Sequence, residues 1–167
     1  MAKSDAFFIR ATVEFNGTNF AQNSIDLGAY VDALGKSVLR IHRVSVKYGS
    51  PLQNPLPVTS LNTGCNSGWQ LTTQSQSAMV NITDKSVIST GDLFCQTDAG
   101  GNTIVLQETQ DVNPEDWTNG YLVGVEQIYL GCDQTNATDL TRVSIILECT
   151  VETLSQSAAM ALALSQQ

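Results

Sequence analysis

Apolar and polar side chains alternate one by one along several stretches of this chain, and a period of two is the pattern of half-buried β-strands. The clearest stretch runs from Arg142 to Leu154, where one face carries only apolar side chains: Val143, Ile145, Leu147, Cys149 and Val151. Residues 7–15 alternate in the same way. The pattern predicts a fold dominated by strands.

Residues 38–48 also alternate, but the phase of the alternation changes in the middle of the segment. Leu39 and Ile41 are the apolar, odd-numbered residues before Arg43, and the apolar residues after it are even-numbered: Val44, Val46 and Tyr48. Successive side chains of a strand point to opposite faces, so a change of phase predicts a β-bulge or a strand that changes its packing partner.

Further extended segments are expected at residues 20–31, 69–73, 86–96, 103–108 and 121–130. Residues 98–102 have turn chemistry and predict a hairpin between two of these segments. A short helical turn is expected at residues 31–35, and loops at residues 49–68 and 111–119. About eight antiparallel strands predict an all-β fold, a two-sheet antiparallel jelly-roll sandwich, with an immunoglobulin-like sandwich as the alternative.

The chain is expected to form one β-sandwich domain over residues 1–154, followed by a C-terminal tail over residues 155–167. The tail carries no charge, and Ser155 is a suitable N-cap for a short helix rich in Ala, Leu and Met. Thirteen residues are too few to cross a bilayer as a helix. The sequence leaves open whether the tail packs on its own domain or on a neighbouring subunit through Leu154, Met160, Leu162 and Leu164.

The charge of the chain is acidic and sparse. The formal net charge is −8, and charged residues make up 14% of the chain, against about 25% in an ordinary soluble domain. Proteins that bind nucleic acid normally carry a basic surface, so sequence-specific nucleic-acid binding is not expected. The chain begins MAKSDAFF without an apolar leader, so no signal peptide is expected either. A weakly charged polar surface suits dense assembly or extracellular exposure.

The cations of this acidic chain are concentrated in one segment. Residues 36–47 hold four of the eight Lys and Arg residues and the single histidine. One interpretation is a solvated strand face that nearby acids balance. The other is a contact with an acidic neighbouring subunit or with anionic lipid head groups. The candidate subunit-facing or lipid-facing residues are Lys36, Arg40, His42, Arg43 and Lys47.

The sequence offers no recognisable catalytic or metal-binding motif. One histidine cannot supply a zinc site of several imidazoles, and His42 lies between two arginines without a local carboxylate to orient it. There is no P-loop and no GxGxxG motif. The acids at Asp111, Glu115 and Asp116, and at Asp133 and Asp139, lack EF-hand spacing, so solvated loop acids are favoured over a calcium site. No enzymatic activity, cofactor or small-molecule substrate is expected.

The four cysteines are too far apart for a CxxC motif. Cys149 belongs to the apolar face of the last strand and is expected to be a buried thiol. Reduced thiols are expected throughout, although the sequence leaves a disulfide open among Cys65, Cys95 and Cys132.

The N-terminal strand, the block LGAYVDALGKSVLRIHRVSV, the polar loops and the long final strand together resemble the single jelly-roll major capsid proteins of icosahedral bacterial or archaeal viruses. The resemblance implies a non-enzymatic structural subunit of the virion, which assembles in the host cytoplasm with copies of itself into capsomers. Other capsid proteins and an internal viral membrane are further candidate partners under this hypothesis.

A second hypothesis is a carbohydrate-binding β-sandwich module, or another extracellular structural or adhesion subunit. Trp69, Trp117 and Tyr121 would then offer flat faces on which sugar rings stack.

Overall fold

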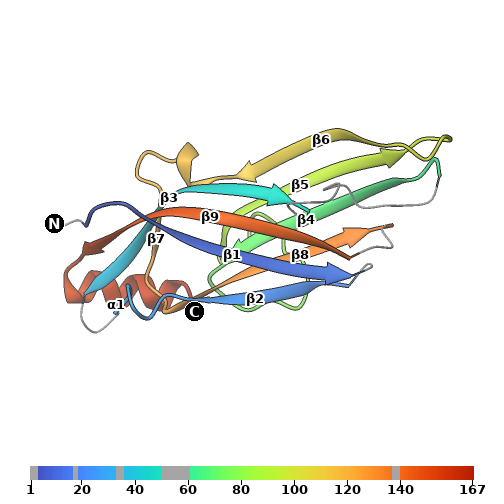
Figure 1. The fold of residues 1–167 in the computed structure, drawn as a ribbon. Coiled ribbons are helices and arrows are strands. Elements are labelled where there is room, and N and C mark those ends of the chain that lie inside the picture. Colours follow the sequence, from blue (N-terminus) through green and yellow to red (C-terminus); the bar gives the residue numbers. More distant parts are fainter. Residues whose placement is uncertain (1–3, 17–18, 33–35, 50–60, 137–139) are drawn as a thin grey trace.

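The computed structural model describes residues 4–16, 19–32, 36–49, 61–136 and 140–167. Within these ranges the chain forms nine strands and one α-helix, arranged as two stacked sheets (Figure 1). Sheet A has the strand order β1-β9-β3-β7 and sheet B the order β2-β8-β4-β5-β6. The strands of sheet A are β1 (Phe7–Asn16), β9 (Leu140–Thr153), β3 (Ser37–Tyr48) and β7 (Tyr121–Val123). Those of sheet B are β2 (Ala21–Asp26), β8 (Gln127–Thr135), β4 (Gly64–Thr72), β5 (Val87–Thr97) and β6 (Thr103–Val112).

The strands pair in a nested order. β1 pairs with β9, β2 with β8, β3 with β7, and β4 with β5, all antiparallel. The chain therefore runs as one long hairpin that is folded over into two sheets, which is the arrangement of a jelly roll. β6 is an addition to this set; among the described residues it pairs only with β5, at the edge of sheet B. The predicted all-β jelly-roll sandwich with a short C-terminal helix is confirmed.

The ninth strand arises where the sequence predicts a single segment. Residues 121–130, expected as one strand, divide at Gly124 into the end of β7 in sheet A and the start of β8 in sheet B. This prediction is wrong, because the chain changes sheets there. A Cβ on Gly124 would lie 3.0 Å from Cγ of Leu162, so the small residue admits the C-terminal helix at the crossing point.

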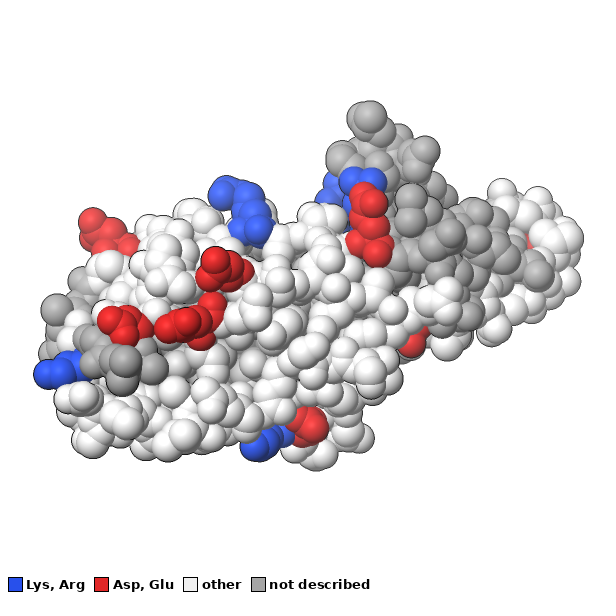
Figure 2. Space-filling model, turned by 90° about the horizontal axis from the view of Figure 1, so that it is seen from below, with Lys and Arg blue, Asp and Glu red and all other residues white. Residues whose placement is uncertain are grey.

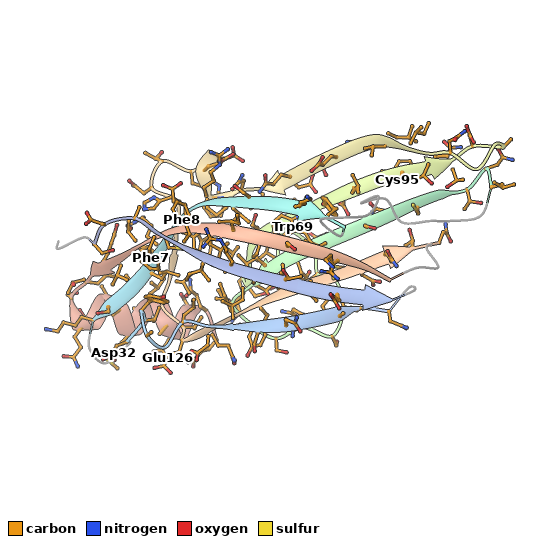
Figure 3. All side chains as sticks on the ribbon, in the orientation of Figure 1. Phe7, Phe8, Asp32, Trp69, Cys95 and Glu126 are labelled. Atoms are coloured by element: carbon orange, nitrogen blue, oxygen red, sulfur yellow. The ribbon has the colours of Figure 1, made fainter. Side chains whose placement is uncertain are left out.

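The core lies between the inner faces of the two sheets. The alternating residues of β9 and the odd-numbered residues of β4 point into it, and Trp69 is its largest fully buried side chain (Figure 3). The change of phase in residues 38–48 is a register shift between Ile41 and Arg43 against β9. The predicted bulge is therefore confirmed, and it keeps both halves of β3 in the core despite the change of parity.

Several boundaries differ from those expected. β4 begins at Gly64, so the expected loop at residues 49–68 ends earlier, and residues 50–60 lie outside the described residues. β6 extends to Val112, and the loop that follows contains the 3-10 helix η1 (Pro114–Asp116). The expected helical turn at residues 31–35 falls largely outside the described residues.

The C-terminal helix α1 (Gln156–Ser165) packs against its own domain (Figure 1). Ser155 caps it, because its side-chain oxygen accepts a hydrogen bond of 3.3 Å from the amide of Ala158. Ala159 and Ala163 face the sandwich and are buried. Small side chains on this side let the helix lie close to the turn between β7 and β8.

Candidate assembly surfaces

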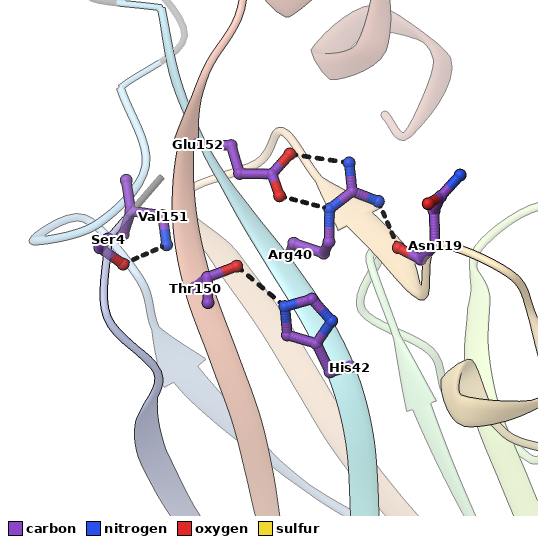
Figure 4. A network of polar contacts seen from close by, with 7 residues as sticks. All are labelled: Ser4, Arg40, His42, Asn119, Thr150, Val151 and Glu152. Atoms are coloured by element: carbon purple, nitrogen blue, oxygen red, sulfur yellow. Dashed lines mark hydrogen bonds and ion pairs between the residues drawn. The ribbon is translucent and has the colours of Figure 1, made fainter. Parts of the chain in front are cut away.

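The predicted basic segment lies on β3, where a buried ion pair neutralises its central cation. The Nε and Nη2 atoms of Arg40 each donate a 2.7 Å hydrogen bond to the carboxylate of Glu152 on β9 (Figure 4). Arg40 also donates to the backbone oxygen of Asn119. The two charged side chains are only 14% and 8% exposed. Arg40 therefore joins β3, β9 and the loop before β7, and is not available as a surface cation.

The other predicted basic residues divide between paired and exposed positions. Nε2 of His42 lies 2.9 Å from Oγ1 of Thr150 on β9, and Arg43 forms an exposed ion pair of 2.9 Å with Glu115 of η1. Lys36 and Lys47 are both exposed. The structure thus does not bring the five residues together as one cationic surface.

The outer face of sheet A carries exposed apolar side chains between cations. Phe8 on β1 and Ile146 on β9 are 55% and 41% exposed. The guanidinium of Arg10 lies 5.9 Å from the centre of the Phe8 ring, a cation–π contact. Lys47 lies on the far side of β9 from Arg10, since β9 pairs with both β1 and β3. We call Phe8, Arg10, Ile146 and Lys47 the sheet A ridge.

The outer face of sheet B has a groove of opposite character. Its volume is about 790 Å³, and its lining includes Gly68 of β4, Asp92 of β5 and Asp133 of β8. The register places Gly68 directly between these two aspartates. Asp111 of β6 also lines the groove, while Met79 and Ile82 supply apolar atoms. We call this feature the acidic groove.

Asp92 is the most constrained carboxylate of the acidic groove. One of its oxygens accepts a hydrogen bond of 3.1 Å from the side-chain amide of Asn66. Partial burial raises the pKa of Asp92 above its ordinary value, and the negative charge of Asp111 raises it further. The raised pKa means that Asp92 binds a proton more readily than an ordinary aspartate does.

Sequence reasoning missed the acidic groove, although one signal for it was present. Residues 86–141 contain no Lys or Arg, while they hold both Asp92 and Asp133. A long segment that contains acids and no cations predicts a negatively charged surface, but only when the strands that carry the acids are known to be neighbours. Figure 2 shows how sparse charge is on one face of the molecule: most of the visible described surface is uncharged, and the charged side chains are few and scattered.

The β5–β6 hairpin exposes a second apolar area. It extends past the end of β3 in Figure 1, so sheet A does not cover its outer part. Three consecutive residues of the edge strand β6 are about half exposed: Ile104, Val105 and Leu106. Phe94 on β5 is exposed to a lesser degree. β6 carries no Lys or Pro, the residues that usually protect an edge strand from pairing with another chain.

The predicted docking residues of the tail lie in different environments. Leu162 contacts the backbone at Gly124, and Leu154 is half-buried. Met160 and Leu164 are exposed. The firmest attachment of the tail is polar: the side chain of Gln166 accepts a 2.8 Å hydrogen bond from the amide of Gly124 and donates a 2.7 Å bond to the carbonyl of Leu122.

All four cysteines are buried and carry free thiols. Cys65 of β4 and Cys95 of β5 are direct cross-strand partners. Burial raises the pKa of Cys95 and of Cys149 to about 12, so neither forms a reactive thiolate near neutral pH. Among the described residues, no group of three or more His, Cys, Asp or Glu side chains is arranged to hold a metal ion. Asp139 lies outside those residues.

The aromatic residues proposed for sugar stacking are separated by the fold. Trp69 is buried between the sheets and cannot stack on a ligand, so that part of the prediction is wrong. Trp117 is 45% exposed, and its ring lies 5.7 Å from that of Tyr121 at a tilt of 34°. Within the described ranges, no helix is both long enough and apolar enough to span a bilayer.

No protein-family model matches this chain, and no curated protein matches it in sequence. Solved structures resemble it in fold. VP1 of Trichodysplasia spinulosa-associated polyomavirus, solved in complex with sialylated precision glycooligomers, matches with a TM-score of 0.51 at 8% identity, covering 89% of this chain and 95% of that chain.

Two weaker likenesses have lower TM-scores. The unassembled VP1 pentamer of Washington University Polyomavirus has a TM-score of 0.46 at 8% identity, covering 89% of this chain and 93% of that chain. The capsid structure of Helicobacter pylori bacteriophage KHP30 has a TM-score of 0.31 at 10% identity, covering 88% and 91%. These neighbours are viral capsid proteins. The likeness to VP1 of Trichodysplasia spinulosa-associated polyomavirus supports the jelly-roll fold of this chain and nothing finer.

Proposed function

We propose that this chain is a non-enzymatic structural subunit of a viral capsid, and that it assembles with copies of itself into capsomers. The observation that carries the proposal is the complete nested strand order of a jelly roll in a chain whose described charged residues are few. The fold likeness to polyomavirus VP1 supports it. The finer part of the proposal is a virion of a bacterial or archaeal virus, with assembly in the host cytoplasm.

The structure offers exposed surfaces suited to contacts between subunits. The sheet A ridge, the β5–β6 hairpin and the outer side of α1 all expose large apolar side chains. Contiguous exposed apolar areas on a soluble domain commonly mark interaction sites. Other capsid proteins and an internal viral membrane remain candidate partners, with Lys36 and Lys47 as exposed cations of the basic segment, outside the described ion pairs, that could contact lipid head groups.

The test is the state of the purified protein in solution. We expect light scattering after size-exclusion chromatography to give the mass of a closed oligomer, and electron microscopy to show rings or closed particles. A chain that remains monomeric at about 100 µM, a concentration at which even weak micromolar contacts are populated, would contradict the proposal.

A second candidate function is carbohydrate binding. The observation that favours it is the exposed Trp117 ring beside Tyr121, since such pairs can stack on sugar rings. We expect binding on a glycan array to be lost in Trp117→Ala and kept in Phe8→Ala, which removes an exposed aromatic ring elsewhere. An array without a bound glycan for the native protein would reject this function.

A further inference from the structure

The sheet A ridge has a defined spacing of charge around an apolar centre. Ile146 of β9 is level with Arg10 of β1, and Ser144, two residues earlier, is level with Lys47 of β3. The two cations thus flank β9 from opposite sides, with their Cα atoms roughly 12 Å apart across two strand spacings and two residues of rise along the strand. Within the described residues, neither Arg10 nor Lys47 has a carboxylate at ion-pair distance.

The acidic groove has a similar spacing of charge with the opposite sign. Asp92 and Asp133 are both level with Gly68, one on each neighbouring strand, and so their Cα atoms lie roughly 10 Å apart. Gly68 has no side chain, and a Cβ there would lie 2.8 Å from Oδ1 of Asp92 and 3.2 Å from Cε of Met79, so the Met79 methyl group covers the floor of the groove beside the carboxylate. The volume of about 790 Å³ is sufficient for large apolar side chains.

We propose that the acidic groove of one copy receives the sheet A ridge of a second copy, with Ile146 and Phe8 against the apolar Met79 and Ile82 of the groove and with Arg10 and Lys47 facing the carboxylates of Asp92 and Asp133. The inference rests on the proposed self-assembling function and identifies the surfaces that carry it. Charge complementarity selects the partner, because Arg10 and Lys47 are exposed cations of one face that form no ion pair among the described residues, and the described lining of the groove contains acids without a cation.

The other charges on the two faces are compatible with this contact. Glu148, the acid beside Phe8 on the ridge, has Arg43 as its cross-strand neighbour on β3. Asp111 adds a third carboxylate to the groove. A desolvated aromatic ring with charged groups around it is the usual composition of an interface hot spot, and Phe8 with Arg10 supplies it here.

The geometry of the contact also determines what kind of assembly it makes. The ridge and the groove lie on the outer faces of the two different sheets, so they point in opposite directions from one molecule. Each copy therefore presents a ridge to one neighbour and a groove to the next. Such a head-to-tail contact generates a ring when the rotation closes, and an open chain when it does not.

The experiment reverses the charge of each face separately and then mixes the two variants. The ridge variant carries Arg10→Glu and Lys47→Glu, and the groove variant carries Asp92→Lys and Asp133→Lys. Each variant alone presents like charges on both faces, so we expect its self-association to weaken at least about tenfold in sedimentation. The 1:1 mixture again pairs opposite charges, and we expect association to return with the two variants alternating.

Controls separate this proposal from effects on folding and from the proposed function. Lys85→Glu and Asp116→Lys make the same charge changes on exposed residues outside both faces, and we expect native association. Circular dichroism checks the fold of each variant. If the groove variant does not fold, Asp111→Lys with Asp133→Lys replaces it.

Four outcomes decide the matter. Recovery on mixing supports the contact. Native protein that associates while both variants associate equally well overturns the contact and leaves the proposed function standing. Loss of association in each variant without recovery in the mixture also overturns it, because the groove would then bind some other part of the subunit. Native protein that does not associate at all contradicts the proposed function itself.

Discussion

Arg40 shows how a single residue can be identified by sequence and still be misread in its role. The cation was a candidate for contact with a neighbour, but its partner is Glu152, 112 residues away on the adjacent strand. Nothing in the spacing of the sequence indicates that the two are level across β3 and β9. A pairing of this kind depends on strand register, which a sequence without its relatives does not define.

The ion pair gives the first prediction. Glu152→Gln leaves the charge of Arg40 in a largely buried position without its counterion, so we expect the free energy of unfolding to fall by about 3 kcal/mol. Urea denaturation measures it. The matched control is Glu115→Gln, which removes the exposed partner of Arg43 and should cost less than about 1 kcal/mol. Equal losses in the two variants would show that the Arg40 pair is not a special contact.

Asp92 gives a prediction about pH. Its pKa is raised in the folded protein, chiefly by burial and then by the charge of Asp111. The pKa of an aspartate in an unfolded chain is about 3.9. The folded state therefore binds more protons than the unfolded state over this window. The contribution of Asp92 to stability is most favourable below about pH 4 and declines as the pH rises through the folded pKa.

Asp92→Asn removes this titration while keeping an oxygen for the amide of Asn66. We expect the stability of the variant relative to the native protein to increase from pH 4 toward neutrality and then to level off. Urea unfolding of dilute protein at several pH values measures this difference. A difference that is constant, or that decreases with pH, would contradict the raised pKa.

At the scale of elements, the pattern of alternating side chains predicted the long strands well, because each of them buries one face only. β1, β3 and β9 appear close to their expected bounds, and the bulge in β3 was readable from the change of parity. The division at Gly124 was not readable, because residues 121–130 are mostly apolar on both sides of it and a single glycine, without a proline, separates β7 from the apolar start of β8. The expected role of Trp69 failed for a related reason: an aromatic residue in a strand can face either side, and only the register decides.

The side chain of Gln166 attaches the end of the C-terminal helix to the turn between β7 and β8. Gln166→Leu would leave the amide of Gly124 and the carbonyl of Leu122 without their partners, so we expect a loss of about 1–3 kcal/mol in the free energy of unfolding. Gln156→Leu is the matched control, because it makes the same substitution at an exposed position on the first turn of α1. We expect the control to change stability by less than about 0.5 kcal/mol. Thermal denaturation of both variants compares them.

At the scale of the whole molecule, the nested order makes the last strand a central one. β9 lies between β1 and β3 and pairs with β1 along ten consecutive residues, from Phe7 with Cys149 to Asn16 with Leu140. Among the strands that the structure describes, β1 has no other partner in its sheet. Sheet A therefore cannot form until the chain has been made almost to its end, and long-range pairing of this kind is slow to form.

Two truncated chains test this dependence. A chain of residues 1–139 lacks β9, so β1 loses its partner, the inner face of sheet B loses its cover, and we expect no cooperative unfolding transition. A chain of residues 1–155 keeps all nine strands and lacks only α1, so we expect a cooperative transition at a lower midpoint. Circular dichroism during urea titration distinguishes the two. A cooperative transition in the shorter chain would mean that sheet B with β1 and β3 forms a stable unit without β9. The pairing of β9 with β1 and β3 would then not be the contact on which the fold depends.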